Sequence, residues 1–323
     1  MLKTFRMLAA AGGLLLATAI ASAQAWPTGT IRIIIPAAPG GSSDHVARLV
    51  ADHLQAALGA AVFLDHRPGA GGIVGTQLLI KSAPDGHTFM LGNIGPQVFA
   101  PAMNPAVTYV TARDLVPVGS LVTFGNVMVV NPNVRATNVR ELIDLGKASP
   151  GKINFGSPGN GQSQHISGEM FKRMAGIDIV HVPYKGTAAA TTDLIAGQVQ
   201  MMFGNIPAAL PFIQSGQLRA IAVTAGKRSR MLPNVPTVAE SGLPEFKVSS
   251  WVALFAPAGT PRAILERVNA EANKAWASPA GQKILAQYDF DSEPLSLEQM
   301  SAFVTGETAR WSKVIKEANI KAD

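Results

Sequence analysis

The chain has 323 residues, a formal net charge of +6, no cysteine and an aromatic content of 6%. The missing cysteines exclude disulfides and thiolate metal sites, and the length is enough for two ordinary domains. Because Lys and Arg are scattered rather than gathered in a basic stripe with aromatics, we expect no nucleic-acid partner.

The first 25 residues have the pattern of a secretory signal peptide. Lys3 and Arg6 form a basic region, an apolar stretch runs from 8 to 21, and Ala23-Gln24-Ala25 fits an A-x-A cleavage site. The apolar stretch is shorter than the roughly 20 residues of a membrane span, and glycine dilutes it. We therefore expect residues 1–25 to be removed on export.

Strands and helices then alternate along the chain, as the apolar periodicities predict. The first set comprises a strand at 30–35, a helix at 44–58, a strand at 62–64, a helix that ends near 82 and a strand at 89–91. The second set comprises strands at 127–130, 153–155, 180–184, 199–203 and 219–224, with helices at 139–148, 166–174 and 188–196. A strand at 251–256 leads into residues 262–320, which are predicted to be mostly helical.

This alternation predicts an α/β fold with mostly parallel sheets. Because two such sets precede a helical tail, we expect one lobe built from both ends of the chain and a second lobe inserted between them. The expected bounds are 26–125 with 251–323 for lobe 1, and 126–250 for lobe 2. Two strands would cross between the lobes, near 124–127 and 249–251.

One local arrangement, a strand followed by a glycine turn and a helix, occurs twice. The first turn is Pro39-Gly40-Gly41-Ser42-Ser43-Asp44, and the second runs from Ser157 to His165. Each presents a helix N-terminus, where unpaired N–H groups and the helix dipole attract an anion, at the strand ends where α/β sheets bind ligands. Either turn alone is more typical of ordinary capping by Ser or Asp. The duplication favours a pair of turns that clamp a carboxylate.

The motifs of enzymes are missing from the sequence. The glycine spacings fit neither GxGxxG nor GxxxxGK[ST], and GxSxG and HExxH do not occur. His45 and His53 are too far apart on one helix to bind a metal together, so we expect them on a solvated face. We predict no catalytic residue, no metal and no cofactor.

Six segments in order resemble the receptor family of the tripartite tricarboxylate transporters, the Bug family. They are IRIIIPAAPGGSSDHVARLVADHL, HRPGAGGIVGTQLL, PDGHTFMLGN, INFGSPGNGQSQHISGEMFK, HVPYKGTAAATTDLIAGQVQMMFGN and WVALFAPAGTP, between residues 31 and 261. The resemblance implies a type II periplasmic binding protein, or Venus flytrap, with two lobes that close on a small organic acid. It also implies delivery to membrane transporter subunits, a periplasmic location and a monomeric state.

The resemblance further implies that both turns and three strand ends bind the ligand carboxylate, partly through water. These residues are Gly40, Gly41, Ser42, Ser43, Asn93, Ser157, Gly159, Asn160, Gly161, Ser163, His165, Tyr184 and Asn205. His165 is as well suited to bond nearby backbone as to donate to the ligand. Lys185 would add positive charge, although a solvated turn lysine is the simpler interpretation.

The sequence departs from the family pattern at three places near the expected pocket. Ala37-Ala38 stand where an aromatic residue often precedes the first turn, Gln162 where a small residue is usual, and Gly204 where an acidic residue is frequent. The lost acid and the added amide suggest a ligand without an ammonium group.

Two other functions remain open from the sequence. A periplasmic hydrolase would use Ser163 and His165, but two residues apart at a helix start is poor geometry for a nucleophile and its base. A ligand-presenting subunit for a membrane sensor kinase would use the same closed form as a transport receptor. The sequence favours a non-enzymatic receptor for a carboxylate.

Overall fold

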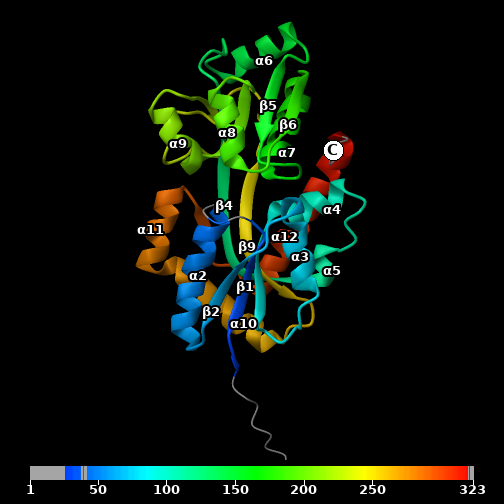
Figure 1. Ribbon diagram of the computed structural model, residues 1–323, viewed down its shortest axis with the longest axis vertical. Coiled ribbons are helices and arrows are strands. Elements are labelled where there is room, and N and C mark those ends of the chain that lie inside the picture. The colour runs from blue at the N-terminus through cyan, green and yellow to red at the C-terminus, as the bar shows by residue number, and fades with distance from the viewer. Residues whose placement is uncertain (1–25, 38, 40–41, 319, 321–323) are drawn as a thin grey trace, which may run out of the picture.

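The computed structural model describes residues 26–37, 39, 42–318 and 320, whose strands form one mixed ten-stranded sheet. Its order is β2-β1-β3-β9-β4-β7-β5-β6, and β8 and β10 also pair with β4. Helices cover the sheet in two lobes, one above the other in Figure 1. The predicted signal peptide lies outside the described residues.

Lobe 1 contains both ends of the described chain. Its elements are β1 (Ile31–Ile35), α2 (Ser42–Leu58), β2 (Val62–His66), η2 (Ala70–Gly72), α3 (Ile73–Ile80), β3 (Thr88–Asn93), η3 (Gly95–Phe99), α4 (Ala100–Met103), α5 (Thr111–Asp114), α10 (Arg262–Ala277), α11 (Pro279–Tyr288), β10 (Asp291–Glu293) and α12 (Leu297–Ala318). Lobe 2 is inserted between them. Its elements are α6 (Val139–Ala148), β5 (Ile153–Ser157), α7 (Ser163–Ala175), β6 (Ile179–Pro183), α8 (Thr187–Ile195), β7 (Met201–Asn205), α9 (Ile206–Gln214) and β8 (Arg219–Val223).

Two long strands, β4 (Leu115–Val130) and β9 (Ser249–Pro257), run between the lobes (Figure 1). The first part of β4, up to Gly125, pairs with β9, and the part from Asn126 onward pairs with β7 and β8 of lobe 2. The partner therefore changes inside the segment predicted to cross. β9 begins beside the second predicted crossing. The residue before it, Val248, donates its backbone N–H to Thr224 O of lobe 2 (2.9 Å).

The sheet is more mixed than the sequence predicts. Among the described strands, four pairs are parallel and five are antiparallel. All five antiparallel pairs involve β4 or β9, because these two strands run against their neighbours where they cross between the lobes. Each lobe keeps a set of parallel strands at its outer edge. The carboxyl ends of these strands face the other lobe (Figure 1).

Residues 262–320 are mostly helical, as predicted, and one short strand interrupts the helices. The short strand β10 separates α11 from α12 and pairs with Leu121–Thr123 of β4. Its sequence, Asp291-Ser292-Glu293, carries no apolar alternation, so periodicity could not reveal it. This strand ties the chain that follows α11 to the strand that crosses between the lobes.

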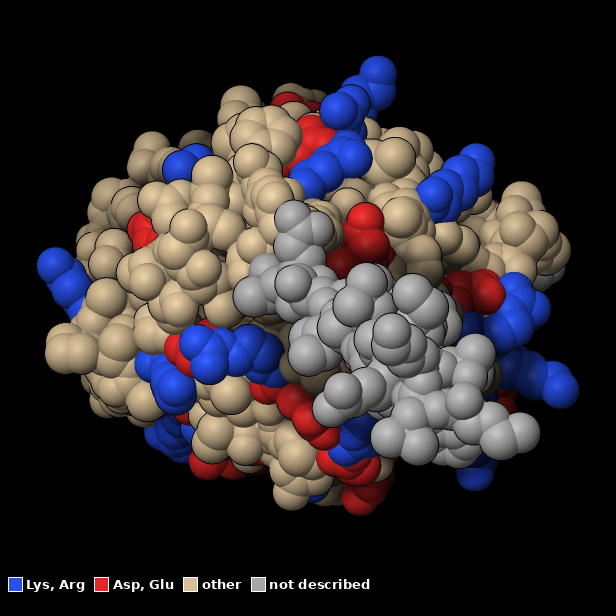
Figure 2. Space-filling view, turned by 90° about the horizontal axis from the view of Figure 1, so that it is seen from below, with Lys and Arg blue, Asp and Glu red and all other residues tan. Residues whose placement is uncertain are grey.

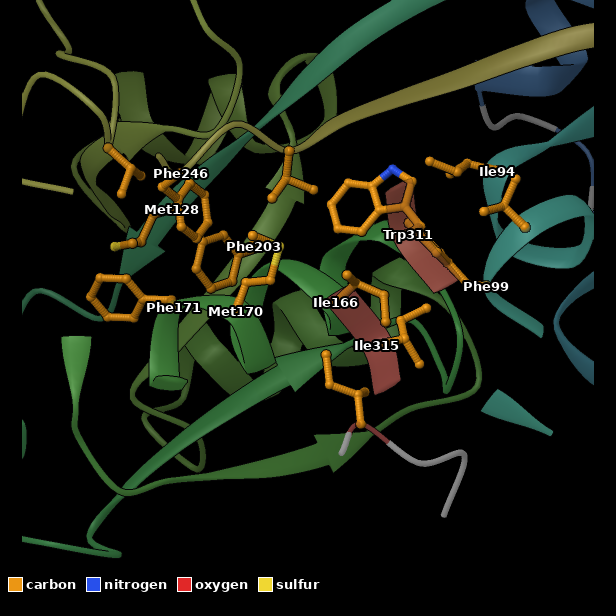
Figure 3. Close-up of a cluster of buried hydrophobic side chains, with 14 of the residues drawn as sticks. Ile94, Phe99, Met128, Ile166, Met170, Phe171, Phe203, Phe246, Trp311 and Ile315 are labelled. Carbon is orange, nitrogen blue, oxygen red and sulfur yellow. The ribbon is translucent and has the colours of Figure 1, made fainter. Parts of the chain in front are cut away.

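The apolar core is continuous across the two lobes. Besides one cluster within each lobe, a third joins residues of both, including Phe99 of lobe 1 and Phe203 of lobe 2. Figure 3 shows Trp311 and Ile315 of α12 beside Ile166 of α7 within this cluster. Burial of such side chains is worth about 1.5–3 kcal/mol each, so the C-terminal helix helps to hold lobe 2.

The face at the foot of lobe 1 carries Lys and Arg interspersed with Asp and Glu (Figure 2). Because opposite charges alternate on this face, the electrostatic field that it produces in solvent is weak. Within the ranges that the structure describes, no helix has the length and apolar character needed to cross a bilayer.

Candidate functional site: a cavity between the lobes

A cavity of about 750 Å³ lies between the two lobes. This volume falls inside the range of about 300–1,000 Å³ that is usual for small-molecule sites. Both lobes and both crossing strands line it, the strands through Phe124, Ser250 and Val252. A ligand there would contact both lobes and both crossing strands.

The lobe 2 side of the cavity is built from helix N-termini. Ser163 and Gln164 in the first turn of α7, and Thr187 and Ala188 in the first turn of α8, line it. No side chain caps either helix. Two helices elsewhere are capped by a side chain, α6 by Asn138 and α11 by Ser278, whereas α3, α9 and α10 also lack such a cap. The first-turn N–H groups of α7 and α8 therefore favour an anion in the cavity.

The charged residues around the cavity also favour a negatively charged ligand. Its described lining contains no Asp or Glu, and Lys185 is the lining residue with a permanent charge. The acidic residue in the first turn of α2, Asp44, is 3% exposed, pairs with Arg48 (3.1 Å) and lies 3.2 Å from His66 Nε2, and it is not part of the described lining. The described lining therefore favours negative charge and offers no carboxylate to an ammonium group.

The structure brings some of the predicted residues to the cavity. Ser43, Asn93, Ser163 and Asn205 line it, as do Lys185 and Gln162. Ser42 begins α2, whereas Gly40 and Gly41 lie outside the described residues. The lining does not include Ser157, Gly159, Asn160, Gly161, His165 or Tyr184.

Several of these other residues shape the second turn from behind. Gly161 N donates to His165 Nδ1 (3.2 Å), so the histidine bonds the turn backbone, one of the two roles that the sequence allows. His165 is 2% exposed and stacks on His181 at 4.1 Å between ring centroids. Burial, with a smaller contribution from His165, lowers the pKa of His181 to about 3, and His181 Nε2 lies 2.7 Å from Ser157 Oγ.

Tyr184, in the turn after β6, bonds helix α8 and is not part of the cavity lining. Its hydroxyl donates to Asp193 Oδ2 of α8 (2.8 Å). Burial and this carboxylate raise the pKa of Tyr184 to about 12. The residue therefore fixes α8 relative to the end of β6.

An amide network that the sequence did not reveal joins the crossing strand to the α7 turn. Asn126 of β4 is fully buried, and its Nδ2 donates to Ser163 Oγ (3.2 Å). Gln164 Nε2 donates to Asn205 Oδ1 (2.9 Å), and Asn205 is the register partner of Asn126. Asn126 adjoins a glycine in a predicted crossing, where neither motif nor periodicity singles it out.

The lobes touch beside the cavity, where η2 and the start of η3 approach the second turn. Gln162 Nε2 of lobe 2 donates to Gly71 O of lobe 1 (3.3 Å). A Cβ atom at Gly95 would lie 3.0 Å from Gly161 O, too close for easy packing. Glycine at position 95 thus allows the backbones of the two lobes to approach each other, and Gln162, one of the departures from the family pattern, makes the contact.

Aromatic residues at the opposite side were also missed. His45 lines the cavity and stacks on Tyr288, with 4.2 Å between ring centroids, and Phe124 lines it from β4. The prediction of a solvated face is therefore wrong for both histidines of α2. His45 stacks on Tyr288, and His53 lies 3.2 Å from Glu271 of α10. These residues are distant in sequence, and only the fold brings them together.

The fold and the cavity define a two-lobe solute-binding protein. The family model for the tripartite tricarboxylate transporter family receptor matches residues 46–320. Protein BugT of Bordetella pertussis is 37% identical over 320 residues, which is 98% of each chain. The structure of R. palustris Rpa4515 with adipate matches with a TM-score of 0.85 at 33% identity, over 92% of this chain and 99% of that one.

MatC from Rhodopseudomonas palustris, solved with bound malate, gives a TM-score of 0.82 at 29% identity, over 90% of this chain and 100% of that one. The chain belongs to the tripartite tricarboxylate transporter receptor family. It is a solute-binding receptor of a tripartite transporter, and members of its family are periplasmic binding proteins.

Proposed function

We propose that this receptor captures a small organic carboxylate between its lobes and delivers it to the membrane subunits of its transporter. One observation carries the proposal: the N-termini of α7 and α8 face the cavity without side-chain caps, and the described lining holds a lysine but no carboxylate. The adipate and malate bound by two relatives, both organic acids, support the same chemistry.

The proposed motion is a rotation of lobe 2 (126–250) against lobe 1 (26–125 with 251–323) about β4 and β9. Closure would bring the α7 and α8 N-termini onto an anion held at the first turn. It would also exclude water, which strengthens the attraction between the helix termini and the anion. The closed form is then the state that the membrane subunits recognise.

The same proposal covers location, oligomeric state and chemistry. Residues 1–25 would be removed during export to the periplasm, and the mature chain would act as a monomer without enzymatic activity. Ser163 Oγ bonds Asn126 and Gln164, and His165 Nδ1 accepts from the turn backbone, so both groups have structural partners. The ligand would therefore be released unchanged, which analysis of the bound molecule before and after incubation would check.

The first test is thermal unfolding of the mature protein with a panel of carboxylic acids and their amides. A ligand at 100 times its Kd stabilises the fold by about 2.7 kcal/mol, which is a clear shift in Tm. An acid that raises Tm while its amide does not supports the proposal. Stabilisation by sugars, peptides or amides but by no acid would overturn it.

A pair of lysine variants tests the charge of the cavity. Lys185→Gln removes the lining charge, and we expect ligand affinity to fall about two- to fivefold, since an exposed charge pair contributes up to about 1 kcal/mol. Lys152→Gln, at another exposed lysine of lobe 2 outside the cavity, is the matched control and should leave the affinity unchanged. Equal affinities for both variants would place the carboxylate away from Lys185.

A further inference from the structure

Four aromatic rings form a ladder at the lobe 1 side of the cavity. His45 of α2 stacks on Tyr288 at the end of α11 (4.2 Å), Tyr288 stacks on Phe290 (5.6 Å), and Phe290 packs against Phe124 of β4 (5.0 Å). Three of the four, His45, Tyr288 and Phe124, line the cavity. We call these three the aromatic wall.

The aromatic wall is held in place by groups behind it. Phe290 is 1% exposed and supports Tyr288 and Phe124 together. Tyr288 Oη lies 3.3 Å from His45 Nδ1, which fixes these two rings relative to each other. Arg230 of lobe 2 donates to the carbonyl oxygen of Phe290 (2.7 Å). A wall that is already ordered loses little conformational entropy when a ligand packs on it.

The cavity lining next to the wall carries no fixed charge, whereas Arg230 and Asp289 lie behind it. Val252 and Ile94 line the cavity from lobe 1, and Pro207 and Ala208 line it from the first turn of α9. Lys185, the lining residue with a permanent charge, belongs to the β6–α8 turn of lobe 2. The rings offer no opposite charge to a second carboxylate, and burying an unpaired carboxylate is costly in a closed cavity.

We propose that the ligand is an aromatic carboxylic acid, whose carboxylate meets the α7 and α8 N-termini while its flat ring packs on Tyr288 and Phe124. This inference rests on the proposed function and adds to it the chemical class of the ligand body. Stacked aromatic pairs contribute beyond the area that they bury. A planar acid should therefore bind roughly tenfold more tightly than its saturated analogue.

The test compares ligands on the unmodified mature protein by titration calorimetry. Benzoate and cyclohexanecarboxylate share a carboxylate and a six-membered body but differ in planarity, benzamide lacks the charge, and adipate and malate are open-chain diacids. We expect benzoate to bind most tightly, and its ring protons to shift upfield in NMR spectra because they lie over aromatic faces.

The outcomes separate this inference from the function that it rests on. Tighter binding of adipate, malate or cyclohexanecarboxylate than of benzoate would overturn the aromatic class and leave the carboxylate receptor standing. Equal binding of benzamide and benzoate would overturn the carboxylate itself. Preference for benzoate without upfield shifts would place the ring elsewhere in the cavity and would also overturn the inference.

Ring-removal variants locate the contact. Phe124→Leu and Tyr288→Leu keep an apolar side chain but no ring, so the preference for benzoate over cyclohexanecarboxylate should fall toward one. Phe63→Leu is the matched control, because Phe63 is 56% exposed on β2 and does not line the cavity. If Tyr288→Leu unfolds, Phe124→Leu and the comparison on the unmodified protein still decide. An unchanged preference in Phe124→Leu, with folding verified by circular dichroism, contradicts the proposed wall.

Discussion

Besides the two crossing strands and the contact of Gln162 with Gly71, two regions of the described structure tie lobe 2 to lobe 1 through different interactions. On one side α12 packs apolar residues into a core shared with α7, which we call the α12 connection (Trp311, Ile315 and Ile166). On the other side charged groups reach from lobe 2 to the segment after α11, which we call the α11 connection (Arg230 and Lys227 with Asp289 and Asp291).

The α12 connection is dry and closely packed. Trp311 is fully buried, lies edge-on to Phe99 at 5.1 Å, and donates its Nε1–H to Glu307 (3.1 Å). Ile315 and Ile166 are 2% and 0% exposed. Contacts of this kind depend on shape and resist salt.

The α11 connection is ionic and open to water. Arg230, with 56% of its side chain exposed, bonds Asp289 (3.1 Å) and the carbonyl oxygen of Phe290, and Lys227 bonds Asp291 (2.8 Å). Exposed ion pairs contribute little free energy and are screened by salt. We infer that packing of α12 determines how firmly the lobes are held together. The α11 connection instead positions the segment that carries Tyr288 of the aromatic wall.

The largest expected effect comes from the α12 connection. Trp311→Ala leaves a cavity between the lobes, so the free energy of unfolding should fall by about 3–5 kcal/mol, as measured by urea denaturation. Trp311→Phe keeps a ring and loses the bond to Glu307, so it should cost less and serves as the control. A loss below about 1 kcal/mol for the alanine variant would mean that α12 does not hold lobe 2.

The next largest effect should come from acid, which is expected to destabilise the packing around α7. His181 stacks on His165 beside Ile166, and burial holds its pKa near 3, below the ordinary value of 6.5. The unfolded chain therefore takes up the proton first. Stability is fully present above pH 6.5 and is lost as the pH falls from about 6.5 toward 3. We expect Tm to drop by several degrees between pH 7 and pH 4.5.

A histidine pair of variants isolates that effect. In His181→Phe, which keeps a ring against Phe155, the drop in Tm between the two pH values should be smaller. His87→Phe, in lobe 1 near Thr28, is the control and should keep the full drop. The same drop in both variants would assign the acid sensitivity to other groups.

The α11 connection should respond less to mutation. Arg230→Ala removes three partners and leaves Asp289, whose side chain is 10% exposed, without its cation. We expect a loss of about 1 kcal/mol in urea denaturation. Arg230→Lys should restore only part of it, since an ammonium group cannot match the spread of the guanidinium donors. A loss as large as that of Trp311→Ala would erase the distinction between the two connections.

Local chemistry made part of this architecture predictable. Ser163, Asn93 and Asn205 stand at strand ends or helix starts, where ligands of α/β sheets gather, and all three line the cavity. The crossing near 124–127 followed from the order of the βα sets. Strand β4 as a whole did not, because Pro117, Gly119 and Gly125 interrupt its apolar pattern.

Long-range contacts escaped the sequence for a physical reason. Periodicity shows that α12 buries one face, but it does not say that Trp311 meets Phe99 or that Ile315 reaches lobe 2. Tyr288 and His45 lie 243 positions apart, and each has an ordinary neighbourhood in the sequence. Such pairs form where segments from the two ends of the chain pack together, as His45 and Tyr288 do within lobe 1, and no local pattern records them.

The smallest expected effect is that of salt on stability, and it distinguishes the two connections without further mutation of the core. At 1 M salt the Debye length falls to about 3 Å, so the α11 ion pairs are screened while the packing of α12 is not. The stability difference between the unmodified protein and Arg230→Ala should shrink by a few tenths of a kcal/mol, and the difference for Trp311→Ala should stay the same. Urea denaturation of the three proteins at 0.05 M and 1 M NaCl measures both differences. If the Arg230→Ala difference persists at high salt, the guanidinium acts there by hydrogen bonds and packing against Phe290, and the α11 connection is structural rather than electrostatic.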